Sequence, residues 1–122
     1  MNERSYVGID NTDKNEWIVV LWCEGKSIFS RPYGHTPAEL EALVRFINER
    51  CDRPKICLNP TNPHAFEVVK YISGIAGVEV VLMSNAGLRL HLDWLPTEST
   101  APVFQANSRR AYLLACCAER MI

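Results

Sequence analysis

Two segments of strand length are apolar on both of their faces, and this feature limits the fold more than any other. Residues 17–22 read Trp-Ile-Val-Val-Leu-Trp, and residues 78–83 are apolar except for Glu79. A strand with one face in water alternates apolar and polar residues, whereas a strand covered on both faces does not. These segments therefore predict a sheet with other elements packed on both faces. The second segment is expected in the middle of a parallel part of that sheet.

The pattern along the rest of the chain predicts the element order β-β-β-α-β-α-β-α-α. Three strands with short connections, followed by strands that helical crossovers bring in, form a mixed sheet. We therefore predict one α/β domain of residues 1–122, with a five-stranded sheet of three antiparallel strands and then parallel strands, and helices on both faces. The expected strands are 5–9, 16–23, 27–31, 55–58 and 78–83, and the expected helices begin near residues 36, 62, 87 and 107.

Two of these helices carry start signals. Thr36 and Asn62 are capping residues, and each is followed by proline, which fits the first helical position. Glu39 lies three residues after Thr36, which predicts a capping box. The apolar residues expected on the inner faces of these two helices are Leu40, Leu43, Val44 and Ile47, and Ala65, Val68, Val69 and Ile72.

Composition narrows the class of protein. The chain has 122 residues, 48% apolar and 22% charged, with a formal net charge of -1. This balance predicts one soluble domain with no overall basic field, so that nucleic-acid binding would need a local patch. We find no stretch long enough to span a membrane and no signal peptide at the N-terminus, and we expect a cytoplasmic protein. The five cysteines form no C-x-x-C pair, which favours reduced and mostly buried thiols.

Asp10 is the leading candidate for a functional residue. It ends the apolar run Tyr6–Ile9 and precedes a polar turn, so a strand delivers its carboxylate to the end of the sheet. Metal-dependent phosphoryl-transfer enzymes present a metal ligand in this way, but one carboxylate alone holds a divalent cation poorly. Asp10 is therefore either a metal ligand, with Asp13 as a possible helper, or a strand-end aspartate that caps the turn at Asn11.

Four short motifs, in order, give the chain a family resemblance. They are Val7-Gly8-Ile9-Asp10, Asn59-Pro60-Thr61-Asn62-Pro63, Ser84-Asn85-Ala86-Gly87-Leu88-Arg89, and Gln105-Ala106-Asn107-Ser108-Arg109-Arg110-Ala111. The chain resembles the N-terminal RuvC-like domain of the DEDD insertion-sequence transposases, the Piv/MooV group, over nearly its whole length. The resemblance implies a ribonuclease H-like fold. It also implies that the second, C-terminal domain of those transposases, which carries a serine nucleophile, is absent here.

In that family four acids hold two divalent cations that cut and join DNA. Of the four positions only Asp10 keeps its acid, and the others are Asn59, Asn107 and Arg110. A guanidinium about 4 Å from a dication adds roughly 8 kcal/mol of repulsion at an effective dielectric of 20. We therefore predict a catalytically inactive, transposase-like domain without a cofactor, which acts in nucleic-acid-associated binding or in assembly. The same positions suggest that the Arg110 charge replaces the metal and pairs with Asp10.

Two other functions remain open. One is an active Mg- or Mn-dependent DNA transposase or nuclease with relocated acids, for which Asp93 and Glu98 are the candidates. The other is a protein-interaction or dimerisation module with no role on nucleic acid. Asn59 and Asn107 also fit plain turn and helix-entry roles. The histidines, His35, His64 and His91, are scattered and show no ligand spacing.

The last expected helix, 107–121, bears on partners. Residues 111–118 are apolar all round, so this helix should be covered on more than one side, by the domain interior or by a partner. A homodimer through this helix is therefore a prediction. Arg89 and Arg109, with Arg110, form either a modest phosphate-contacting patch for DNA or RNA or a solvated helix face.

Overall fold

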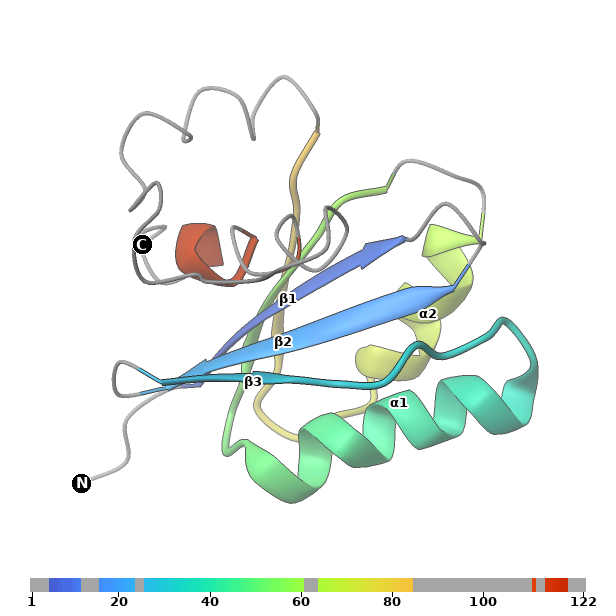
Figure 1. Ribbon diagram of the computed structural model, residues 1–122, viewed down its shortest axis with the longest axis horizontal. Coiled ribbons are helices and arrows are strands. Elements are labelled where there is room, and N and C mark those ends of the chain that lie inside the picture. The colour runs from blue at the N-terminus through green and yellow to red at the C-terminus, as the bar shows by residue number, and fades with distance from the viewer. Residues whose placement is uncertain are drawn as a thin grey trace.

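The computed structural model describes residues 5–11, 16–23, 26–60, 64–84, 111 and 114–118. They form one mixed sheet with helices on both sides (Figure 1). The strands and helices are β1 (Tyr6–Asn11), β2 (Trp17–Cys23), β3 (Lys26–Phe29), α1 (Pro37–Arg50), β4 (Lys55–Leu58), α2 (Ala65–Ile72) and β5 (Glu79–Leu82), and residues 111 and 114–118 are also helical.

The sheet has the order β3-β2-β1-β4-β5. β2 runs antiparallel to β1 and β3, whereas β1, β4 and β5 are parallel to one another. The two crossovers that contain α1 and α2 bring in β4 and β5, as parallel pairing requires. The predicted mixed α/β sheet of five strands is confirmed.

The place expected for the last strand was wrong. Residues 78–83 were expected in the middle of the sheet, but β5 is an outer strand of the described sheet. Its cover is incomplete: Val80 packs against the core, whereas Leu82, on the same face of the strand, is 48% exposed, and Glu79 on the other face is also exposed. An apolar run alone does not separate a central strand from an outer strand that lies under a helix.

The third strand is shorter than the sequence predicts. β3 ends at Phe29 rather than at Arg31, because the Ser30 hydroxyl accepts the hydrogen bond of the Val19 N–H at 2.9 Å. The backbone then turns back to a single bridge between Trp17 and Tyr33. A side-chain acceptor thus takes the N–H that the next ladder bond would need.

One face of the sheet is covered by α1 and α2. Leu40, Leu43 and Ile47 of α1 are buried as predicted, and Val44 is partly buried. Thr36 caps α1, its Oγ1 accepting from the Glu39 N–H at 3.2 Å. The first core on this face also contains Val7, Ile9, Trp17, Val19, Leu21, Tyr33, Ile56, Leu58, Ala65, Val68, Ile72 and Ile75.

The Glu39 side chain does not complete a capping box with Thr36. Its carboxylate accepts instead from the Gly34 N–H at 3.1 Å and from Arg31 at 3.0 Å on each oxygen. These bonds lower the pKa of Glu39 to about 2. For α2, the expected cap at Asn62 and Pro63 lies outside the described residues, and the helix begins at Ala65 after His64.

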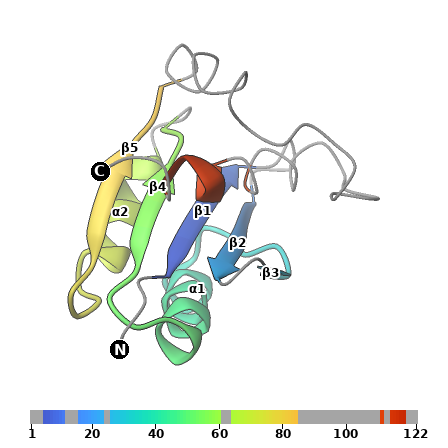
Figure 2. The same ribbon diagram turned by 90° about the vertical axis from the view of Figure 1, so that its left-hand side faces the viewer.

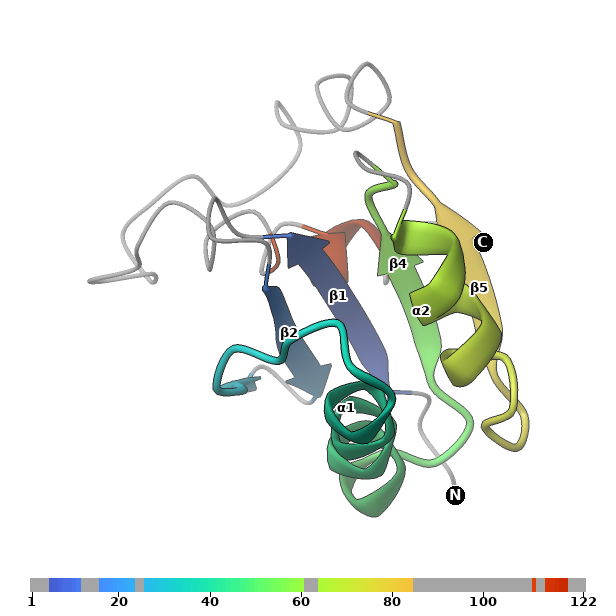
Figure 3. The ribbon, with the colours of Figure 1, turned by 90° about the vertical axis from the view of Figure 1, so that its right-hand side faces the viewer.

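The opposite face of the sheet is covered by the C-terminal helical segment, residues 111 and 114–118. Figures 2 and 3 show this segment and the pair α1 and α2 on opposite sides of the sheet. Every described residue of the segment is at most 4% exposed, and together they contact Ile18, Val20, Cys57 and Met83 in a second core. Five consecutive helical residues point in every direction around the axis, so the segment is covered on all sides within one chain. For these residues the structure shows the interior packing, and the homodimer through helix 107–121 stays a prediction.

Gly8 is the point where this segment meets the sheet. A Cβ atom on Gly8 would collide with the Ala111 carbonyl oxygen and the Ala115 amide nitrogen. The helix backbone therefore rests directly on β1, with no side chain between them.

The buried thiol of Cys57 should be chemically inert. Burial raises its pKa to about 12, and the neighbouring Cys117 thiol adds to the shift. A rise of about three units lowers the thiolate fraction, and hence the alkylation rate, roughly 1000-fold at mildly alkaline pH. We expect iodoacetamide to label the half-buried Cys51 in the native protein while Cys57 stays unmodified, as read by peptide mass spectrometry. Labelling of both at similar rates in native buffer, as in urea, would contradict the described packing.

Candidate functional site

Two of the four site positions meet at the carboxyl ends of β1 and β4. Ile9 pairs with Leu58 in the parallel ladder, and the Asn59 N–H donates to the Ile9 carbonyl at 3.4 Å. Asp10 and Asn59 are therefore neighbours on adjacent strands. The family resemblance predicts these two residues at one site, and in the structure they lie side by side.

Both side chains lie on the face that carries the C-terminal helical segment. Side chains alternate along a strand, and Gly8 and Cys57 face that segment. Asp10 and Asn59, two residues further along each strand, share the same face. Asp10 is 1% exposed and Asn59 is fully buried.

Asn59 has a structural role that the sequence did not indicate. Its Nδ2 donates to the Met83 carbonyl at 2.7 Å, and the Met83 N–H donates to the Leu58 carbonyl at 2.9 Å. A carbonyl can only accept, so this bond fixes which end of the amide faces Met83. Asn59 therefore joins the ends of β4 and β5. The turn or helix-entry role expected for it stays a prediction, because residues 61–63 lie outside the described residues.

Asp10 is part of the strand and is buried with it. β1 continues to Asn11, two residues beyond the predicted end, and the side chain of Asn11 donates to the Glu16 carbonyl at 3.2 Å across the turn. A buried carboxylate is stable only when hydrogen bonds or a positive charge compensate for its lost hydration. A capping role for Asp10 in this turn stays a prediction, because residues 12–15 lie outside the described residues.

The other candidate residues fall in parts of the chain that the structure does not describe. Ala111, which follows Arg110, has its backbone against Gly8, two residues before Asp10. Among described residues, no group of three or more histidine, cysteine, aspartate or glutamate side chains could hold a metal ion. Searched over the same residues, no helix is long and apolar enough to cross a membrane. The candidates outside the described residues are Asp13, Arg89, His91, Asp93, Glu98, Asn107, Arg109 and Arg110.

Two histidines that looked scattered in the sequence lie together. The rings of His35 and His64 are 4.4 Å apart between centroids and tilted by 36°. His35 precedes α1 and His64 precedes α2, and both helices begin at the same end of the sheet. That shared position was the sequence signal that could have predicted the contact.

The hydrogen bonds of these histidines argue against a metal site. The Trp17 indole N–H donates to His35 Nδ1 at 3.0 Å, so the proton of neutral His35 is on Nε2. Binding a metal through Nε2 would move that proton to Nδ1, where it would face the indole donor. His64, half exposed, lies 3.1 Å from a Glu67 oxygen through its Nδ1. The contact between His35 and His64 is therefore a packing contact between the starts of two helices.

Comparisons with models of known protein families and with curated proteins find no match to this chain. The function is therefore argued from the residues themselves.

Proposed function

We propose that the chain is a ribonuclease H-like domain related to the N-terminal domain of DEDD insertion-sequence transposases. The support is the combination of three features. Strands β2 and β3 pair antiparallel beside β1 before two crossovers bring in β4 and β5, helices cover both faces, and Asp10 is the last residue but one of the central strand β1. The resemblance implies each of these features.

We infer further that the domain does not cut DNA and acts in nucleic-acid-associated binding or assembly. The observation that carries this inference is the position and the hydrogen bonding of Asn59. It occupies the strand end beside Asp10, where the family has its second carboxylate, and its amide is bound to Met83. A neutral amide that already serves as a structural hydrogen-bond donor cannot supply the missing charge for two dications.

The same proposal gives Asp10 a present role. Arg110 replaces the metal charge and pairs with the buried Asp10 carboxylate. The packing of Ala111 on Gly8 supports this pairing, because it brings the chain next to Arg110 onto the face where Asp10 lies. An ion pair of this kind would satisfy the need of a buried carboxylate for a counter-charge.

A calorimetric titration with Mn²⁺ tests the inactive assignment. We expect no saturable heat at millimolar Mn²⁺, and the same flat trace for the Asp10→Asn variant. Saturable binding of two ions that disappears in Asp10→Asn would refute the assignment and favour the rival function, an Mg- or Mn-dependent nuclease with acids supplied by Asp93 or Glu98.

A further inference from the structure

A hollow on the α1 side of the molecule, away from Asp10, has an unusual lining. It lies between α1 and the segment that follows β3, and its volume is about 240 Å³. Three of its side chains are arginines and two are aromatic: Arg31, Arg45, Arg50, Tyr33 and Phe46. We call it the arginine hollow.

Two guanidinium–arene stacks form the walls of the arginine hollow. The guanidinium carbon of Arg31 lies 4.3 Å from the centre of the Tyr33 ring, and that of Arg50 lies 4.3 Å from the centre of the Phe46 ring. The two rings are 6.3 Å apart between centroids. A guanidinium is planar by delocalisation, and its ring contact leaves its other face as a surface on which another planar group can stack.

Two of the three positive charges already have partners. Arg31 makes two hydrogen bonds of 3.0 Å to the Glu39 carboxylate. Arg50 donates to the Phe46 carbonyl at 3.2 Å and lies 3.6 Å from a Glu49 oxygen.

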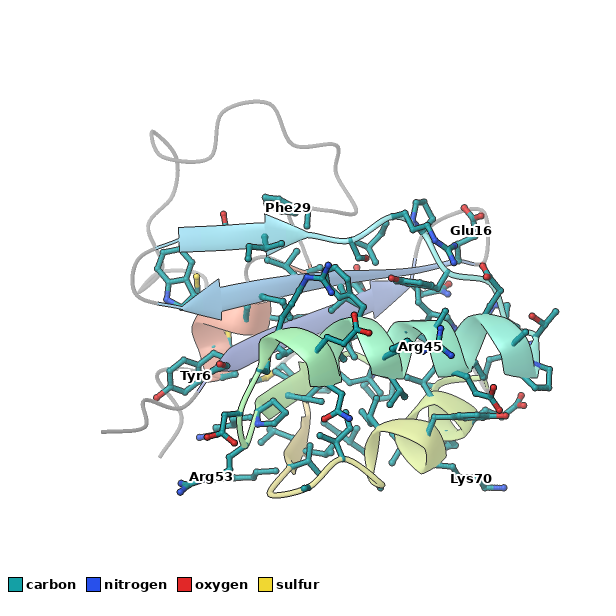
Figure 4. All side chains as sticks on the ribbon, turned by 90° about the horizontal axis from the view of Figure 1, so that it is seen from below. Tyr6, Glu16, Phe29, Arg45, Arg53 and Lys70 are labelled. Carbon is teal, nitrogen blue, oxygen red and sulfur yellow. The ribbon has the colours of Figure 1, made fainter. Side chains whose placement is uncertain are left out.

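Arg45 is the exception. It projects from the exposed side of α1 and makes no hydrogen bond or ion pair with any described residue (Figure 4). The hollow therefore combines planar walls with one cation that has no partner among the described residues.

We propose that the arginine hollow binds single-stranded nucleic acid, with one base against the stacked guanidinium groups and its phosphate on Arg45. The proposal rests on the nucleic-acid-associated role inferred above and assigns that role to this surface. Bases stack on arginine planes as well as on aromatic rings, and one arginine suits one phosphate. The hollow is smaller than the roughly 300–1,000 Å³ of sites that enclose a whole small molecule, which suits one unit of a polymer.

An acidic peptide fits the arginine hollow less well. A carboxylate needs a positive charge but no planar wall, and the planar walls are the larger part of this surface. Glu39 and Glu49 hold two of the three arginines, so a run of acidic side chains would meet only one free cation. A nucleotide presents one phosphate and one base, and the hollow offers one free cation and a stacking surface.

The test is fluorescence anisotropy with labelled oligothymidylate and oligouridylate of about 12 nucleotides, a length within the span of single-strand sites. The variant is Arg45→Ala, and the matched control is Lys70→Ala, which removes one exposed charge from α2 (Figure 4). We expect Arg45→Ala to weaken binding about tenfold and to lower the salt slope by about one phosphate contact. Lys70→Ala should change binding less than twofold.

The outcomes separate this proposal from the function it rests on. Binding that Arg45→Ala leaves unchanged would overturn the hollow as the site and leave the nucleic-acid role standing. Failure of the wild-type protein to bind either oligonucleotide would overturn the hollow as a single-strand site and the single-strand part of the proposed role, and would leave assembly as the role that remains. Tighter, Arg45-dependent binding of an oligoglutamate peptide would reassign the hollow to an acidic protein partner. Circular dichroism should show both variants folded, because both side chains are exposed.

Discussion

Replacing Gly8 with alanine should separate the C-terminal helical segment from the sheet. The new Cβ would overlap two backbone atoms, the Ala111 carbonyl oxygen and the Ala115 amide nitrogen, and no rotamer change relieves a clash between backbone atoms and a Cβ. Overpacking a core by one group costs about 1–3 kcal/mol when side chains can adjust. Here only the helix can move, so we expect a loss of at least about 3 kcal/mol in the free energy of unfolding, measured by urea denaturation.

Gly74→Ala is the matched control. A Cβ at Gly74 would make only an ordinary contact of 3.6 Å with the Tyr71 carbonyl oxygen. Its effect should stay within about 0.5 kcal/mol, as is usual for surface changes. Labelling of Cys116 and Cys117 gives a second readout, since both thiols are buried against the sheet and should react in Gly8→Ala. A Gly8→Ala protein with wild-type stability and protected thiols would disprove the direct helix–sheet contact.

The strand around Gly8 can be predicted from the sequence, but the requirement for glycine at this position cannot. The strand around it could be predicted, because Val7 and Ile9 are apolar and Asp10 ends the run. The need for glycine could not, because it arises from Ala111, more than a hundred residues away in the chain. The outer position of β5 was missed for the same reason, because it depends on tertiary placement, which a local apolar pattern does not encode.

The candidate site was predictable in part. The family resemblance implies that Asp10 and Asn59 belong to one site, and parallel pairing of β1 with β4 brings them together. The hydrogen bond from Asn59 to Met83 forms because β5 lies beside β4. A sequence pattern does not predict an individual side-chain hydrogen bond of this kind. That bond is what makes Asn59 a structural residue as well as a substituted site residue.

Restoring the acid with Asn59→Asp should destabilise the domain more than deleting the side chain. The substitution removes the buried donor to Met83, worth about 1–3 kcal/mol, and sets a carboxylate against a carbonyl oxygen. It also adds a negative charge beside Asp10, and two charges about 5 Å apart repel by roughly 3 kcal/mol at an effective dielectric of 20. We expect a loss of about 4–6 kcal/mol at neutral pH, against about 1–3 kcal/mol for Asn59→Ala.

The pH dependence of this variant follows from the same charges. Burial and the neighbouring Asp10 carboxylate raise the pKa of the new carboxyl in the folded state above its unfolded value of about 4. A raised folded pKa makes the variant most stable, relative to wild type, below that unfolded value, and the stability is lost as the pH rises through the folded pKa. When protonated, the new carboxyl can also donate to Met83 as the amide did. Urea unfolding across this pH range should therefore show the gap to wild type closing in acid.

Adding Mn²⁺ to Asn59→Asp at neutral pH decides between the two accounts of Asp10. If an arginine has replaced the metal, two carboxylates still cannot gather a dication, and millimolar Mn²⁺ should leave the destabilisation unchanged. The double variant Asp10→Asn/Asn59→Asp should then regain about 3 kcal/mol, because the repulsion is removed and the new carboxylate can replace Asp10 as the partner of the arginine, while the lost donor is not replaced. If Mn²⁺ instead restores the stability of Asn59→Asp and has no effect on the double variant, the strand ends of β1 and β4 can still form a metal site. The neutral Asn59 is then the main reason that the wild-type site does not bind the dication.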